Sequence, residues 1–147
     1  MTGSEAKMVD LLLVGIGGTK VFVAASEIKQ VLRAKPLTAV PMGPQHLKGL
    51  ANVHGQVVCV IDAGGVTSLP YCAKQANQNT RLLLLRHAEM HVAIWVDAVY
   101  KMQQLDASVF ADALAKGDEK NDSSQSIVVE GISYDFLQCS KLLHLAA

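Results

Sequence analysis

The chain of 147 residues has the length of one folded domain. Half of its residues are hydrophobic and 18% are charged, which excludes a wholly disordered chain because such chains are poor in apolar residues. Thirteen basic and thirteen acidic residues give a formal net charge of zero, so the basic excess typical of nucleic-acid binders and of proteins drawn to anionic membranes is missing. No apolar stretch approaches the roughly 18 residues that span a bilayer. We therefore expect a cytoplasmic protein that binds no nucleic acid and inserts into no membrane.

The first part of the chain predicts short strands separated by glycine and proline. Residues 11–14 and 21–23 are expected to form two strands, joined by a glycine-rich turn at 15–19. Residues 26–33 predict a short helix, because Ser26 is a suitable N-cap and the apolar residues after it share one helical face.

The segment at 49–61 carries the clearest local pattern. Residues 49–53 and 56–61 predict two strands that are joined by a tight turn at His54 and Gly55. The second strand is apolar at almost every position, so both of its faces are expected to be covered. This strand should therefore lie inside a sheet and not at its edge.

The rest of the chain predicts an alternation of loops, hairpins and two helices. In chain order these are a loop at 62–79, a hairpin of 82–85 with 92–96, a helix at 106–116 capped by Asp106 and stopped by Gly117, a loop at 117–126, a hairpin of 127–129 with 134–137, and a short helix at 140–145. Many short strands with few helices favour a barrel or sandwich architecture.

The glycines at 15–18 follow an apolar strand, as those of phosphate-binding loops do. A Walker loop needs its lysine directly after the last glycine, whereas here Thr19 precedes Lys20. A dinucleotide-binding loop needs a third glycine at the place of Lys20 and a helix after it, and a strand is predicted instead. The pattern indicates a plain hairpin turn.

His87 and His91 lie four residues apart with Glu89 between them, which raises the question of a zinc site. The zinc-hydrolase motif places its glutamate directly after the first histidine and on a helix, and neither condition is met. The cysteines also lack the paired spacing of zinc sites; they are Cys59, Cys72 and Cys139. We predict that the protein needs no metal or cofactor and is not an enzyme.

The order of motifs resembles the CheW family of chemotaxis coupling proteins. Residues 40–44 (Val-Pro-Met-Gly-Pro), followed by residues 47–62, match the family's proline-containing turn, its glycine, its Asn-x-Arg-Gly motif and the apolar strand that ends in Asp62. Residues 81–85 and 94–99 resemble the family's later hairpin, and Leu142-Leu143 its closing element. The resemblance covers about residues 9–145, and the small size points to the pilus-linked, twitching-motility branch.

The resemblance implies a mainly β fold with short helices, in which two small five-stranded β-barrels pack around a shared core. It implies a flexible N-terminus at 1–8 and a single CheW-like domain at 9–147. It also implies a non-catalytic adaptor that couples the cytoplasmic tip of a methyl-accepting chemoreceptor to the regulatory domain of a CheA-like histidine kinase. That kinase domain has the same fold, so barrel-on-barrel docking is expected.

By position, six residues match places that the family uses for partner contact or for shaping the contact surface: Ile28, Gln30, Gly49, Asn52, His54 and Gly55. Some of them depart from the family pattern, because His54 replaces its arginine and Gln30 replaces its usual glutamate. Cys59 replaces a strand proline, and the aspartate near the C-terminus is replaced around Gln138. For Gly49, Asn52 and Gly55 a purely structural role in turn geometry is the alternative.

Two other functions stay open at this stage. A small-ligand-binding β-barrel would need a pocket of several hundred Å³. A divergent CheW-like protein that binds only one of the two partners would be consistent with the loss of the motif arginine and of the helix glutamate.

Overall fold

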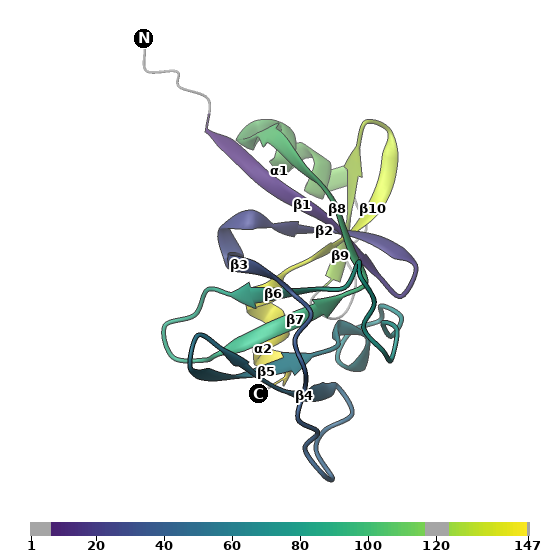
Figure 1. Cartoon of the computed structure of the whole chain (residues 1–147). Coiled ribbons are helices and arrows are strands. Elements are labelled where there is room, and N and C mark those ends of the chain that lie inside the picture. Colours follow the sequence, from purple (N-terminus) through teal and green to yellow (C-terminus); the bar gives the residue numbers. More distant parts are fainter. Residues whose placement is uncertain (1–6, 117–123, 147) are drawn as a thin grey trace.

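The computed structural model describes residues 7–116 and 124–146, which form two five-stranded sheets and two α-helices (Figure 1). The first sheet has the order β8-β1-β2-β10-β9 and the second the order β3-β6-β7-β5-β4. The strands are β1 Met8–Ile16, β2 Thr19–Ala24, β3 Ile28–Arg33, β4 Leu47–Val53, β5 Gln56–Ile61, β6 Arg81–Leu85, β7 Val92–Val96, β8 Ala98–Asp106, β9 Ser124–Val129 and β10 Ile132–Leu137; the helices are α1 Ala107–Lys116 and α2 Cys139–Ala146.

The two sheets repeat one pairing scheme. In each, a parallel pair stands beside antiparallel neighbours: β10 runs parallel to β2, with Phe136 opposite Phe22, and β5 runs parallel to β7, with Ile61 opposite Ile94. All other pairs are antiparallel. The expected mainly β fold of two five-stranded units is confirmed. Within the described ranges, the backbone ladder of each unit ends at two edge strands, and no hydrogen-bonded pairing joins those edges.

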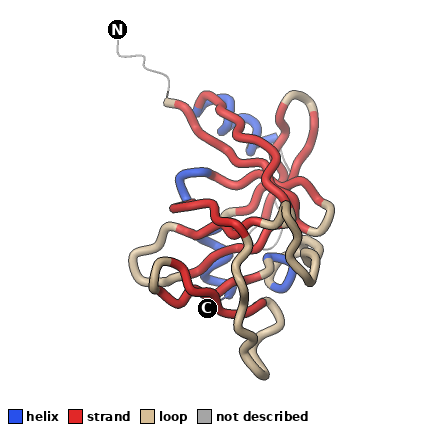
Figure 2. The backbone as a smooth tube through the Cα atoms, in the orientation of Figure 1, coloured by secondary structure: helices blue, strands red, loops and turns tan. Residues whose placement is uncertain are grey.

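Strands β1 and β2 separate two hydrophobic clusters because successive side chains of a strand point to opposite faces. Leu11 and Leu13 join Phe22 and Ala113 of α1 in a cluster on one face of the first sheet. Leu12 and Val14 lie on the other face, in the large cluster shared with the second sheet. The upper and lower halves seen in Figure 2 are therefore held together by one core.

The hairpins predicted around 49–61 and 82–96 are confirmed. Strand β5 lies between β7 and β4, as its apolar sequence predicts. Its covering is incomplete, however: Val58 and Val60 are buried, whereas Val57 near the turn is 63% exposed. All five residues of the neighbouring β7 are buried.

The helix predicted at 26–33 is wrong. Residues Ala25–Glu27 form a single 3-10 turn whose N-cap position is Ala24, and Ser26 makes no capping bond. Residues Ile28–Arg33 form β3, an edge strand paired with β6. The spacing of the apolar residues in this segment suits one face of a helix. In the structure, however, Val31 is 43% exposed, which an edge strand tolerates, and β-branched residues such as Val31 favour the extended backbone.

The loop predicted at 117–126 is wrong at its end, because β9 begins at Ser124 and pairs with β10. The rest of that loop and Gly117 lie outside the described residues. No strand was predicted at residues 98–106, where β8 pairs with β1 through most of its length. Asp106 does cap α1: its Oδ1 accepts hydrogen bonds from the Ser108 amide and hydroxyl at 2.9 and 2.6 Å.

Strand β1 begins at Met8, opposite Asp106. Residues 1–6 lie outside the described residues, so the flexible N-terminus at 1–8 and the single domain at 9–147 stay predictions. Across the described ranges, neither helix has the length and apolar character that crossing a membrane would require.

Candidate functional site

The tip of the β4–β5 hairpin is a tight turn made by His54 and Gly55. Both have positive φ angles, +51° and +83°, as the two central residues of a type I′ hairpin turn require. The Asn52 Oδ1 accepts a hydrogen bond from the Gly55 amide at 3.0 Å and so holds the turn. Asn52 and Gly55 thus serve turn geometry, and the turn presents the exposed His54 side chain to solvent.

Gly49 and Ile28 face inward. A Cβ at Gly49 would lie 2.8 Å from the carbonyl oxygen of Thr38, and Gly49 has a φ of +153° that side chains rarely adopt. The absence of a side chain lets Thr38 exchange two 2.8 Å backbone hydrogen bonds with Leu50. Ile28 is only 8% exposed and pairs with Leu85. Both residues therefore shape the surface from beneath.

Gln30 and His54 line one cavity of about 120 Å³, which we call the hairpin-tip cavity. Gln30 reaches it from β3, and His87 and His91 reach it from the β6–β7 turn. Lys29 lies beside them. The two positions at which this chain loses the family's glutamate and arginine thus belong to the same small space, although they lie in different strand pairs.

The His87 ring stabilises the β6–β7 turn. The His87 Nδ1 accepts hydrogen bonds from the amides of Glu89 and Met90 at 3.0 and 2.9 Å, so this ring nitrogen carries no proton. Among the described residues, no three His, Cys, Asp or Glu side chains are grouped as metal ligands. His87, Glu89 and His91 lie where a hairpin turn was predicted.

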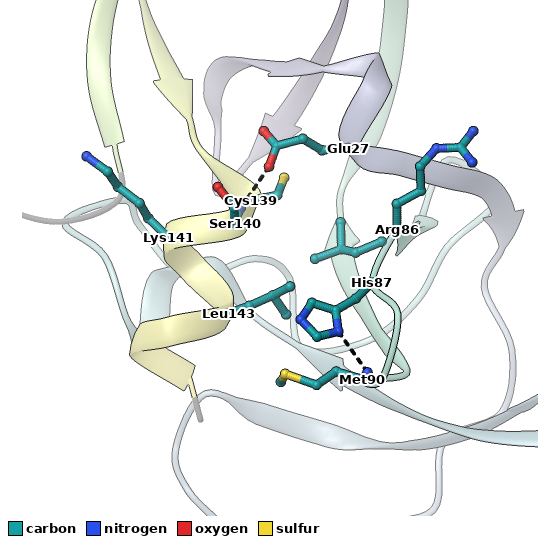
Figure 3. A pocket seen from close by; sticks show the side chains of 9 residues that line it. Glu27, Arg86, His87, Met90, Cys139, Ser140, Lys141 and Leu143 are labelled. Carbon is teal, nitrogen blue, oxygen red and sulfur yellow. Dashed lines mark hydrogen bonds between the residues drawn. The ribbon is translucent and has the colours of Figure 1, made fainter.

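A second cavity of about 390 Å³ adjoins the first and shares Leu85, His87 and Met90 with it (Figure 3). Its opposite wall is the start of α2, with Leu143 facing His87 and Met90 across the space. We call the two cavities together the docking face. Its floor is apolar, and its rim carries cations: Lys29, Arg86 and Lys141.

Glu27 joins two parts of this face. Its Oε2 accepts a hydrogen bond from the Ser140 amide at 2.8 Å, so a carboxylate from the β2–β3 connection lies at the N-terminus of α2. This placement suits the positive end of the helix dipole. Glu27 is the single carboxylate that lines the docking face among the described residues, and it is engaged within the chain.

Cys139 also lines this face but offers no reactive thiolate. Burial, and then the nearby Glu27 carboxylate, raise the pKa of the Cys139 thiol far above its ordinary value. Burial likewise raises the pKa of Cys72, and Asp62 and Asp97 add to the effect. Thiols in such surroundings stay protonated, and the thiol form is a poor nucleophile and metal ligand.

The small-ligand alternative asked for a pocket of several hundred Å³. Besides the 390 Å³ cavity there are grooves of about 450 and 330 Å³, which are lined by loops and strand ends. The face of the first sheet that carries Phe22, Ile127 and Phe136 is instead filled by packed side chains. The described cavities of this size therefore lie between elements and not in that cluster of side chains.

Several residues of the docking face were not predicted from the sequence as site residues. Arg86 and Lys141 carried no pattern, and His87 and His91 were considered only as metal ligands. Their common position depends on the strand order of the second sheet and on the return of α2 to it, and neither can be read from local spacing.

Known proteins resemble this chain in both sequence and structure. The family model described as CheW-like domain matches residues 10–146. Protein PilI of Pseudomonas aeruginosa is 32% identical over 106 residues, which make up 68% of this chain and 57% of that protein. The chain thus spans little more than half the length of this curated relative.

The crystal structure of the scaffolding protein TtCheW from Thermoanaerobacter tengcongensis has the same fold. The two structures superpose over 93% of this chain and 88% of the other, with a TM-score of 0.72 and 12% sequence identity. Two five-stranded sheets around a shared core are thus the fold that this chain shares with TtCheW. Because the family model covers nearly the whole sequence, the chain belongs to the family of proteins with a CheW-like domain.

Proposed function

We propose that this protein couples the cytoplasmic tip of a chemoreceptor to a CheA-like histidine kinase in a pilus-linked chemosensory system. The docking face is the surface that binds the regulatory domain of the kinase. One observation carries the proposal: an apolar floor with a cationic rim joins the hairpin tip, the β6–β7 turn and α2 into one open surface.

The make-up of the docking face suits a transient protein contact. Specific interfaces combine an apolar centre with a polar rim, and transient signalling contacts tend to be small. Here Leu85, Met90 and Leu143 supply the centre. The edge strands β3 and β4 flank it, and their exposed residues, such as Gln30 and Asn52, are available to a partner of similar fold.

The similarity to PilI supports the pilus branch, and the shared fold with TtCheW supports a scaffold role. A variant of the proposal is a protein that keeps one partner only. The loss of both charges at Gln30 and His54 motivates this variant, since a glutamate and an arginine there would supply directional ionic contacts. Both positions line one cavity, so both charges are missing from the same place.

Calorimetry of the whole chain with the regulatory domain of the kinase from the same genome tests the proposal. We expect weak binding, near micromolar, that Arg86→Glu weakens at least fivefold. Lys101→Glu makes the same charge change at an exposed position of β8 and is the matched control. Undetectable binding at high concentration, with both proteins folded, would overturn the proposal, as would equal effects of the two variants.

A further inference from the structure

A second groove, of about 450 Å³, lies at the other end of the second sheet. Two connections form its walls: residues 35–37 come from the β3–β4 connection, and residues 74–76 come from the β5–β6 connection. Lys48 of β4 and Trp95 of β7 lie between them. A neighbouring groove of about 330 Å³ shares Lys48 and Lys74 and extends the surface toward Tyr71.

Three lysines line this groove, Lys35, Lys48 and Lys74. The Lys48 Nζ lies 4.2 Å from the centre of the Trp95 ring and donates a 2.9 Å hydrogen bond to the Ala73 carbonyl. Among the described residues, no Asp or Glu lines the 450 Å³ groove. In the neighbouring one, the oxygens of Asp62 already accept the amides of Gly64 and Cys72 at 3.0 and 2.9 Å.

Trp95 gives this groove a second feature. Its side chain is 3% exposed, and its Nε1–H is buried without a hydrogen-bond partner in the described part of the chain. Native proteins nearly always satisfy buried donors, so a buried indole N–H without an acceptor calls for a reason. An acceptor supplied by a bound partner is one such reason.

We propose that this groove, defined by Lys35, Lys48, Lys74 and Trp95, binds an acidic, extended segment of a protein partner. Carboxylates of the segment pair with the three ammonium groups, and an apolar side chain packs on Pro36 and Leu37 beside the indole. The inference rests on the proposed adaptor function, because an adaptor needs a second surface for the partner that the docking face does not hold.

The chemistry of the groove favours a peptide over a nucleic acid. Single-stranded nucleic acids are held by aromatic rings on which bases stack, whereas the Trp95 ring is buried under Lys48. The chain as a whole has no net charge, so the three lysines of the groove are not part of an overall basic excess. Alternating ammonium groups and apolar side chains match a segment that carries glutamate or aspartate beside leucine.

The two surfaces are placed for simultaneous use. His91 lines the hairpin-tip cavity and directly precedes β7. Trp95 lines the groove of Lys35, Lys48 and Lys74 and lies within β7. Four residues of a strand span roughly 13 Å. Figure 1 shows the β6–β7 turn and the β5–β6 connection at opposite ends of the second sheet.

Trp95 is the single tryptophan of the chain, so the protein gives one indole N–H signal in a nitrogen–proton correlation spectrum. The whole labelled chain is titrated with the acetylated peptide Glu-Leu-Glu-Glu-Leu-Glu and, as a control, with the same peptide carrying glutamine for glutamate. We expect the acidic peptide alone to shift the indole signal, with an effect that weakens as salt is added.

The variant Lys35→Gln/Lys74→Gln is expected to weaken binding of the acidic peptide at least fivefold. Lys7→Gln/Lys101→Gln removes two exposed lysines, one just before β1 and one in β8, and should leave this binding unchanged. An unmoved indole signal at millimolar peptide, an equal response to the glutamine peptide, an equal loss in both variants, or an equal shift with a short single-stranded oligonucleotide would each overturn the groove proposal.

A parallel measurement of binding to the kinase regulatory domain shows whether the groove proposal or the adaptor function fails. If Lys35→Gln/Lys74→Gln binds the kinase domain like the wild type and the acidic peptide moves no signal, the groove proposal fails and the adaptor function stands. If the acidic peptide binds through the lysines while neither kinase nor receptor binds the chain, the adaptor function fails and the groove assignment stands.

Discussion

Glu27 accepts a 2.8 Å hydrogen bond from the amide of Ser140, which ties the β2–β3 connection to the first turn of α2. This bond fixes the helix that forms one wall of the docking face, and Leu142 and Leu143 of the same helix pack into the shared core. The wall is therefore held by one polar contact and by apolar packing.

Replacing Glu27 with alanine should loosen this wall. Loss of a capping interaction costs about 0.5–2 kcal/mol, and we expect Glu27→Ala to lower the free energy of unfolding by about 1 kcal/mol. Glu89→Ala removes a glutamate from the exposed β6–β7 turn and is the control. Denaturant unfolding measures the free energy of unfolding of both variants. A loss in Glu27→Ala no larger than that in the control would contradict a stabilising role of the Glu27–Ser140 hydrogen bond.

Alanine substitutions at Gly49 and Gly131 distinguish two causes of lost stability, backbone strain and steric overlap. Both have positive φ angles, but a Cβ at Gly131 meets nothing within 4 Å, whereas at Gly49 it meets the Thr38 carbonyl oxygen at 2.8 Å. Gly131→Ala should cost about 1–2 kcal/mol of stability from backbone strain alone. Gly49→Ala should cost roughly 3 kcal/mol or more, since steric overlap is added. Equal losses in thermal unfolding would mean that the Thr38 contact does not constrain this position.

His54 should contribute to binding and little to stability. His54→Asn removes the imidazole while keeping a residue that tolerates positive φ, so the melting temperature is expected to stay within a few degrees of wild type. Affinity for one of the two partners should fall tenfold or less in His54→Asn and His54→Ala, because one hydrogen bond of about 0.5–1.5 kcal/mol is lost. Affinities for kinase and receptor are measured separately, and unchanged values for both would remove His54 from the site.

Gln30 and His54 should be energetically coupled because they line one cavity. The double variant Gln30→Glu/His54→Arg creates an ion pair there, and exposed pairs contribute about 0.2–1 kcal/mol. A double-mutant cycle in denaturant unfolding should therefore show a favourable coupling energy of that size. Gln30→Glu with Lys101→Arg, which lies on the other sheet, is expected to be additive.

Asp106 should make α1 sensitive to acid. Hydrogen bonds from the Ser108 hydroxyl and then from the Ser108 amide lower the pKa of this carboxyl below its ordinary 3.8. A carboxyl whose pKa is lowered by folding stabilises the fold above its unfolded pKa, and this stability is lost as the pH falls through the folded pKa. Asp106→Asn should therefore flatten the stability profile below about pH 4. A carboxyl titration by carbon NMR checks the direction, and a midpoint at or above 3.8 contradicts it.

The sequence predicted the elements whose signals are local. The 49–61 hairpin follows from His54-Gly55 between apolar runs, and the α1 cap follows from Asp106 before helical spacing. The apolar residues of Ile28–Arg33 fit both the helical and the strand period, and the helix predicted there is wrong because pairing with β6 makes the segment a strand. No local rule joins Gln30 to His54, or Lys35 to Lys74. These sites exist because the order β3-β6-β7-β5-β4 places remote segments together.

The adaptor function is tested most directly by whether this chain joins its two partners. The kinase regulatory domain and a cytoplasmic fragment of the receptor, both from the same genome, are sedimented with and without the whole chain. We predict a complex that contains all three proteins, and little association of kinase with receptor when the chain is left out. Binary complexes alone, with every component folded and no three-protein species at saturating concentrations, would contradict the coupling role.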